Sequence, residues 1–131
     1  MTKTLTISIS EMMKQAIIRL FDQLNLDYQN TREEQKQIAK SFPPSAEDFT
    51  ILEEIELLTV EIRGYASQLK NHGQIKNETA SRQKLGDLRF LDIPNLSHFY
   101  FDLSSNYPLL KNYLLQLDYL RLLMLEFINL D

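Results

Sequence analysis

The sequence predicts a mainly α-helical protein, a bundle of about four to six helices with one short N-terminal strand as an option. Apolar residues recur every three or four positions over most of the chain, which is the spacing of amphipathic helices. Ser and Thr with capping potential precede several of these periodic segments. Hydrophobic residues at 44% and charged residues at 24% are ordinary globular values. We therefore expect a single helical domain over residues 1–131.

The N-terminus predicts a strand followed by a helix. Apolar and polar residues alternate over residues 4–9, which is typical of a half-buried strand. Ser8 and Glu11 have the spacing of a capping box, so a helix is expected to begin near Ser10. Asn25 is expected to end this helix, because asparagine tolerates the left-handed conformation.

A short, very polar helix is expected next. Thr31 and Glu34 again have capping-box spacing. Pro43 and Pro44 then stop the helix, because proline removes a backbone donor and clashes with the preceding turn.

The central helix is expected to begin at a cap formed by Ser45 with Asp48 and to end at about His72, just before a glycine C-cap. Its apolar residues step by four and three, which predicts the seam of a long antiparallel or coiled-coil-like helix pair: Ile51, Ile55, Leu58, Ile62, Tyr65 and Leu69. Leu57 and Val60 lie off this seam, so we expect a second covered face.

The C-terminal half predicts a loop, an ambiguous segment and a last helix. Residues 73–83 are polar and are expected to form a loop. Residues 90–103 are compatible with helix or strand, and we favour helix for residues 96–103. Ser105 and Pro108 open the last helix, which is apolar on almost every side. Such a helix belongs at the centre of a bundle or against a partner.

No stretch of the chain has the spacing of a catalytic or metal-binding motif. There is no cysteine, the two histidines His72 and His98 are not clustered, and the three glycines are isolated. The acidic residues of the central helix lack the Glu-x-x-His pairs of di-metal bundles. We expect a protein that is not an enzyme and that holds no metal and no cofactor.

Hydrophobicity predicts no membrane span. The most apolar stretch, residues 109–130, contains several charged residues, each of which would cost about 2.5–3.5 kcal/mol at a bilayer centre. The N-terminal residues alternate and do not form an apolar signal segment. The absence of cysteine fits a reducing compartment. We therefore expect a cytoplasmic protein with no membrane partner.

Positive charge gathers in the middle of a chain whose net charge is −4. Residues 63–89 hold six basic and two acidic residues, a net +4. Arg63 and Lys70 fall on one stripe of the central helix, and a basic loop follows. Such a combination can follow a phosphate backbone without reading bases. The candidate nucleic-acid-binding residues are Arg63, Lys70, Lys76, Arg82 and Lys84, with Lys14 and Arg19 as additional contacts.

Two other interpretations of this charge stay open. Lysines in a loop also keep a protein soluble, and they can meet an acidic protein partner.

Gly64 is a separate signal on the same helix. A glycine inside a helix costs about 1 kcal/mol relative to alanine, which suggests close approach by another backbone or a ligand.

The segment LTVEIRGYASQLK, Leu58 to Lys70, resembles a stretch in the small all-helical subunits of type III CRISPR effector complexes. The resemblance implies a bundle without catalytic activity. It also implies stacking in several copies along the guide–target duplex or the displaced strand. Arg63 and Tyr65 would be the arginine and the aromatic residue of the motif.

The N-terminal segment KTLTISISEMMKQAIIRLFDQLNL is similar to the opening of ribbon-helix-helix repressors. In that family the strand pairs with its dimer mate in the major groove of DNA. The similarity implies that Thr4, Thr6 and Ser8 contact bases and that Lys3 contacts a phosphate.

We expect a non-catalytic small helical subunit of a multi-protein nucleic-acid-binding complex, similar to a CRISPR effector. One alternative is a dimeric ribbon-helix-helix-type repressor. Another is a helical protein–protein adaptor, immunity protein or assembly chaperone. The expected partners are other protein subunits and the backbone of a nucleic acid, with self-association as a further option.

Overall fold

The computed structural model describes residues 8–41 and 50–130, and these residues form a bundle of six α-helices. The mainly α-helical prediction is confirmed, and no strand occurs among the described residues. The α-helices are α1 (Ile9–Asn30), α2 (Arg32–Ser41), α3 (Ile51–His72), α4 (Glu78–Gly86), α5 (Pro94–His98) and α6 (Pro108–Ile128). Three short segments lie between α4 and α6: the 3-10 helices η2 (Phe90–Asp92) and η4 (Ser104–Asn106), and the π-helix η3 (Phe99–Leu103).

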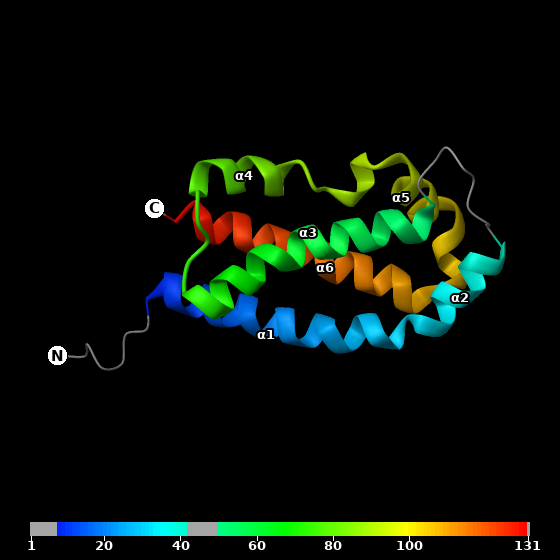
Figure 1. The fold of residues 1–131 in the computed structure, drawn as a ribbon, viewed down its shortest axis with the longest axis horizontal. Helices are drawn as coiled ribbons and strands as arrows, with labels where there is room; N and C mark the ends of the chain where they lie inside the picture. The colour runs from blue at the N-terminus through cyan, green and yellow to red at the C-terminus, as the bar shows by residue number, and fades with distance from the viewer. Residues whose placement is uncertain (1–7, 42–49, 131) are drawn as a thin grey trace.

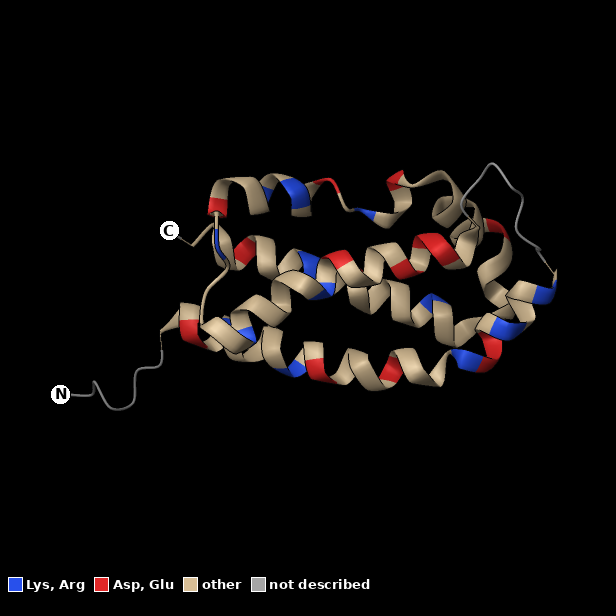
Figure 2. Ribbon diagram, viewed as in Figure 1, with Lys and Arg blue, Asp and Glu red and all other residues tan. Residues whose placement is uncertain are grey.

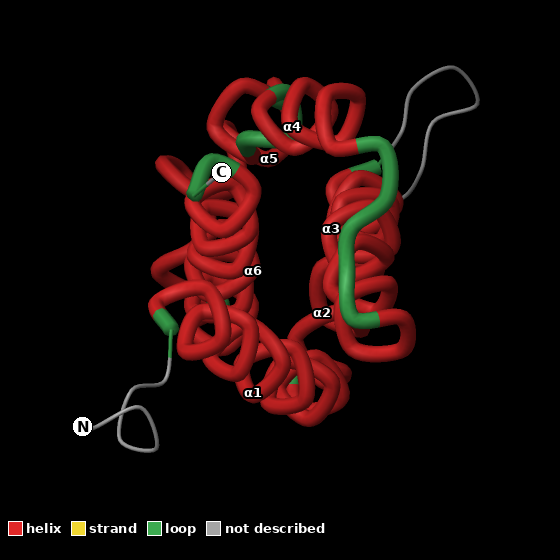
Figure 3. Tube along the Cα trace, turned by 90° about the vertical axis from the view of Figure 1, so that its left-hand side faces the viewer, coloured by secondary structure: helices red, strands yellow, loops and turns green. Residues whose placement is uncertain are grey.

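The three long helices α1, α3 and α6 run side by side along the bundle (Figure 1). An end-on view shows α3 and α6 on two sides, α1 below them, and the α4–α5 layer above them (Figure 3). α1 packs on both α6 and α3, whereas α4 packs on α6 and α5 packs on α3. α1 and α4 therefore lie on opposite sides of the molecule.

The core lies between these helices and consists of apolar side chains at helical spacing. Five of the six predicted seam residues of α3 are buried, and the seam passes through Ala66 where Tyr65 was expected. The step after Ile62 is four residues, which keeps the seam on the inner face of a helix with 3.6 residues per turn. The core residues of the other long helices include Ile17, Leu24, Leu110, Tyr113, Leu114, Leu117, Leu120 and Met124.

α1 begins as expected and ends later than expected. The Ser8 hydroxyl accepts a hydrogen bond from the Glu11 amide at 3.0 Å, so the predicted cap is confirmed. The predicted end at Asn25 is wrong, because α1 continues to Asn30. Tyr28, in the added turn, packs on Tyr113 with ring centroids 4.9 Å apart. This tertiary contact outweighs a weak local stop signal. Residues 4–7 of the predicted strand lie outside the described residues.

The polar helix α2 has different caps from those predicted. Thr31 is the C-cap of α1, and its hydroxyl donates to the Tyr28 carbonyl at 2.7 Å. Glu34 caps another helix: its carboxylate accepts the backbone amides of Leu109 and Leu110 at 3.0 and 2.8 Å. The expected capping box of Thr31 with Glu34 is therefore wrong, and Glu34 ties α2 to the first turn of α6. The prolines expected to stop α2 lie outside the described residues.

The central helix α3 begins at Ile51, with Thr50 as its cap in place of the expected Ser45 with Asp48. The Thr50 hydroxyl accepts the Glu53 amide at 3.1 Å. Ser45 and Asp48 lie outside the described residues. The predicted C-cap is confirmed, because Gly73 adopts the left-handed conformation with φ 77°.

The loop expected over residues 73–83 is replaced in part by α4. The Ser81 hydroxyl donates to the Lys76 carbonyl at 2.7 Å, and the Arg121 guanidinium of α6 donates to the Leu85 carbonyl at 3.1 Å. Tertiary contacts thus stabilise a helix whose own sequence is polar. Residues 96–103 belong to α5 and the π-helix η3, so they are helical, as favoured. Among the described residues, no helix has both the length and the apolar content of a membrane span.

Candidate interaction surfaces

The seven predicted nucleic-acid-binding residues do not form one patch. Figure 2 shows Lys and Arg dispersed among acidic positions over the bundle. α1 and α4 lie on opposite sides of the bundle, so the basic residues of these two helices belong to elements on different sides (Figure 3). Two of the seven lie on α1, two on α3, one in the turn after α3 and two on α4: Lys14, Arg19, Arg63, Lys70, Lys76, Arg82 and Lys84.

Arg63 lies partly buried at the junction of α1 and α3. Its guanidinium carbon is 5.4 Å from the centroid of the Phe21 ring, and its Nε atom is buried without a hydrogen-bond partner. Nearby, the Tyr113 hydroxyl donates to the Thr59 hydroxyl at 3.2 Å. Burial raises the pKa of Tyr113 to about 12, and the Arg63 charge opposes this rise. Arg63 therefore belongs to the packing of the bundle.

Lys70 and Lys14 also have intramolecular neighbours. The Lys70 amine forms an ion pair with Asp22 at 2.5 Å and lies 5.7 Å from the centroid of the Phe21 ring. The Lys14 amine would lie 3.5 Å from a Cβ atom placed on Gly73, at the C-terminal end of α3. This end carries the negative pole of the helix dipole, which favours a cation.

Lys76, Arg82 and Lys84 are exposed and form no ion pair within residues 8–41 and 50–130. The buried residues of α4 are Ser81 and Leu85. Successive residues of a helix are about 100° apart, so Arg82 and Lys84 lie on opposite flanks of this buried face. Arg82 and Lys84 therefore do not share one face of α4.

The outward side of α3 carries an apolar stripe that the seam prediction assigned to a covered face. Leu57 is 47% exposed and Val60 is 64% exposed, so the described residues leave both uncovered and that expectation is wrong. Two adjoining hollows of about 260 and 250 Å³ lie along the stripe. We call this surface the α3 outer face; its residues are Glu53, Glu56, Leu57, Val60, Glu61, Gly64, Tyr65 and Gln68.

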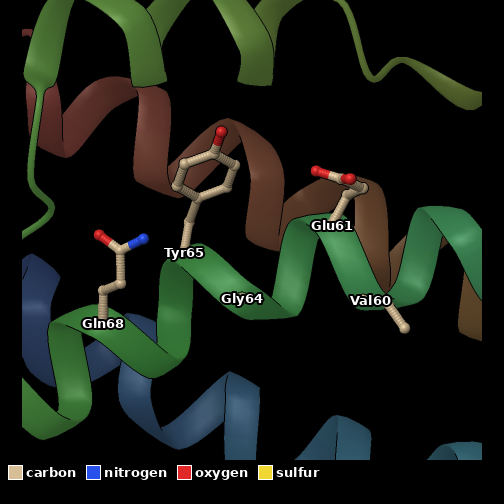
Figure 4. Close-up of a pocket in the computed structure, with 5 residues that line it drawn as sticks. All are labelled: Val60, Glu61, Gly64, Tyr65 and Gln68. Carbon is tan, nitrogen blue, oxygen red and sulfur yellow. The ribbon is translucent and has the colours of Figure 1, made fainter.

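Gly64 lies at the centre of one hollow. Figure 4 shows Glu61, Tyr65 and Gln68 on one side of the helix and Val60 pointing the opposite way, with Gly64 between them. A Cβ atom on Gly64 would meet nothing within 4 Å. The close approach expected at this glycine is therefore not made by the described part of the chain.

The α3 outer face is negatively charged. Glu53, Glu56 and Glu61 border the apolar stripe, and none of them forms an ion pair within the described residues. Burial raises the pKa of Tyr65, and the Glu61 charge raises it further. This face repels phosphate groups and favours a cationic partner.

The described residues include one close histidine–carboxylate pair. His98 Nδ1 lies 2.7 Å from an Asp102 carboxylate oxygen on the protein surface. No group of three or more His, Asp or Glu side chains in the described part of the chain could hold a metal ion. The Ser8 hydroxyl, expected to contact a base, caps α1; Lys3, Thr4 and Thr6 lie outside the described residues.

No family model, curated protein or solved structure matches the chain. Function is therefore inferred from the charge, shape and exposure of these surfaces.

Proposed function

We propose that the protein is a non-catalytic helical interaction module that binds a partner protein through the α3 outer face. The observation that carries this proposal is the exposure of Leu57 and Val60 on a helix whose opposite side is tightly packed. Full burial of an aliphatic side chain contributes about 1.5–3 kcal/mol, and about half of each of these side chains is exposed, so covering both contributes about 1.5–3 kcal/mol to binding. Exposed apolar stripes bordered by charges are typical of protein interfaces.

An amphipathic helix is the partner element that fits this surface. Glu53, Leu57, Val60 and Gly64 step by four and three residues, which is the spacing of a helix–helix seam. Gly64 presents no side chain, so a second helix can approach closely at this point. The acidic border favours a partner helix whose flanks carry Lys or Arg.

Photo-crosslinking in cells tests this proposal while the partner is still unidentified. A photoreactive phenylalanine derivative replaces Leu57 in one variant and Leu26 of α1, which is 56% exposed, in the control. We expect a discrete adduct from position 57 that disappears when Val60→Glu is added. Equal adducts from both positions, or none from position 57, would contradict the proposal.

The charge of the partner is tested by selection from a library of helical peptides. Peptides that bind the folded protein but not its Val60→Glu variant should combine an apolar stripe with flanking Lys or Arg. Selected peptides without this basic bias would show that the acidic border does not choose the partner.

A second candidate function is supported by the exposure of Lys76, Arg82 and Lys84. In this candidate the chain is a subunit of a nucleic-acid complex, as its resemblance to CRISPR effector subunits implies. The α3 outer face would contact a neighbouring protein subunit, and the residues around α4 would contact phosphates. Arg63 and Lys70 would support the bundle in this arrangement.

Fluorescence polarisation with labelled single-stranded DNA and RNA at low salt tests the second candidate. Changing Lys76, Arg82 and Lys84 to Glu should weaken binding and reduce the salt slope by about 2, since each phosphate contact contributes about 0.7. The matched control changes Arg32, Lys36 and Lys40 of α2 to Glu, which alters net charge equally. Equal losses in both variants would indicate a net-charge effect and overturn this candidate.

A further inference from the structure

α6 carries a second exposed apolar stripe, on a different side of the molecule. Leu115 is 40% exposed, Tyr119 is 53% exposed and Leu122 is 45% exposed. These residues step by four and three along the helix, so they lie on one face. The last helix was expected at the centre of the bundle or against a partner, and its inner side meets α1, α3 and α4. We call the exposed stripe, with Lys111 and Glu126 at its two ends, the α6 outer face.

The middle of the α6 outer face carries no free charge. Asp118, beside the stripe, pairs with Arg121 at 2.8 Å, and Arg121 also donates to the Leu85 carbonyl. Lys111 and Glu126 form no ion pair with other described residues, and the Lys111 amine lies 5.5 Å from the centroid of the Tyr100 ring. Unlike the α3 outer face, this stripe therefore has no acidic border along its length.

Lys111 and Glu126 each lie at the end of α6 where the helix dipole disfavours their charge. Lys111 lies in the first turn of α6, where the dipole disfavours a cation. Glu126 lies in the last turn, where it disfavours an anion. A neighbouring helix that runs in the opposite direction would place its own C-terminal end beside Lys111 and its N-terminal end beside Glu126. Both unfavourable placements would then be compensated.

We propose that the α6 outer face pairs antiparallel with the same face of a second copy of the chain, about a two-fold axis between Asp118 and Tyr119. A two-fold interface is self-complementary, so residues at equal distances on either side of the axis meet across it. Leu115 meets Leu122 of the second copy, and Lys111 meets its Glu126, twice by symmetry. A parallel pairing would oppose like charges at both ends.

This pairing is independent of the proposed function. The end-on view places α6 and α3 on opposite sides of the bundle (Figure 3). A dimer formed through α6 therefore leaves both α3 outer faces open.

Sedimentation equilibrium of the full chain tests for the dimer. We expect dimers at micromolar concentrations, and monomers after Leu115→Glu or Leu122→Glu. Leu26→Glu, at an exposed apolar residue of α1, should leave the dimer intact. Circular dichroism confirms that each variant is folded. A wild-type chain that stays monomeric up to about 100 μM would overturn the proposal, because the association free energy would then be weaker than about −5.5 kcal/mol.

Charge exchange tests the antiparallel direction. Lys111→Glu alone and Glu126→Lys alone should each raise the dimer dissociation constant about tenfold, because two ion pairs become repulsive contacts. The double variant restores both ion pairs but places each charge beside the unfavourable end of the partner helix, so its dissociation constant should lie between those of the single variants and the wild type. A double variant as weak as the single ones would exclude the pairing of Lys111 with Glu126.

The chain has no cysteine, so engineered disulfides supply an independent test. Mixing Leu115→Cys chains with Leu122→Cys chains should give mainly mixed disulfide dimers on oxidation. Dimers formed chiefly between identical chains would indicate a parallel arrangement and overturn the proposal.

Discussion

At the scale of single residues, Phe21 shows how cations can belong to the packing of a bundle. The Arg63 guanidinium and the Lys70 amine, both from α3, lie against this one ring of α1. Each such contact contributes about 0.5–1 kcal/mol at exposed sites and more when the cation is desolvated. Substituting either cation would therefore disturb the α1–α3 contact together with the surface charge. The residues around α4 are cleaner probes of nucleic-acid binding.

Replacing Gly64 with alanine should separate stability from binding. The new methyl group would meet nothing within 4 Å, so the gain in helix propensity, about 1 kcal/mol, should appear as increased stability. The same methyl group should weaken an approaching partner helix. Urea unfolding measures the first effect, and the yield of the adduct from position 57 measures the second.

Gly86→Ala is the matched control, because Gly86 also has open space around it but lies at the end of α4. It should leave the adduct unchanged. A Gly64→Ala protein that is more stable and forms the adduct fully would show that no helix approaches this position.

The raised pKa of the Tyr113 hydroxyl predicts that the folded protein loses stability in strong base. Burial raises its pKa from 10.0 to about 12, so the folded state holds this proton more tightly than the unfolded state. The contribution of the protonated hydroxyl to the free energy of unfolding is intact below pH 10. It falls as the pH rises from 10 to about 12, by at most about 1.4 kcal/mol per pH unit.

Urea unfolding at about pH 9 and pH 11 checks this effect through the difference between variants. Tyr113→Phe has no proton to lose and should be less sensitive to the change. Tyr119→Phe, at an exposed position, should behave as the wild type does. Identical pH dependence in all three proteins would contradict the prediction.

At the scale of elements, Glu34 links α2 to the start of α6. Its two carboxylate oxygens accept the Leu109 and Leu110 amides, which have no partners within their own helix. Glu34→Ala should reduce the free energy of unfolding by about 1–2 kcal/mol, because it removes a charged cap.

Urea unfolding measures this cost, and the neighbouring residue gives the control. Among the residues that the structure describes, Glu33 forms only a surface ion pair with Lys36, so Glu33→Ala should change stability by less than about 0.5 kcal/mol. Similar effects at both positions would show that the cap contributes nothing.

The elements that sequence could predict are those decided by local spacing. The Ser8 cap and the Gly73 cap depend on residues within one turn, and both were correct. α4 was missed because its helix depends on Arg121 from α6. Glu34 was assigned to the wrong helix because its partners lie far along the chain. Exposure at Val60 depends on where the other helices lie, so periodicity alone could not show it.

At the scale of the whole molecule, three surfaces of different chemistry surround one bundle. The α3 outer face is apolar with acidic borders, whereas the α6 outer face is apolar with charges only at its ends. α4, which carries Arg82 and Lys84, lies above these two helices and between them in the end-on view (Figure 3). Each surface therefore favours a different kind of partner.

This arrangement predicts that pairing and partner binding are separable. The two outer faces share no residue and lie on opposite sides of the bundle, so substitutions in them should have additive effects. Val60→Glu should abolish the adduct from position 57 and leave the dimer intact. Leu122→Glu should give monomers that still form the adduct in full. Sedimentation and crosslinking measure both effects in the same four proteins. These are the wild type, the two single variants and the double variant. A loss of the adduct in Leu122→Glu monomers would mean that the partner helix requires both copies, and the two surfaces would then form one site.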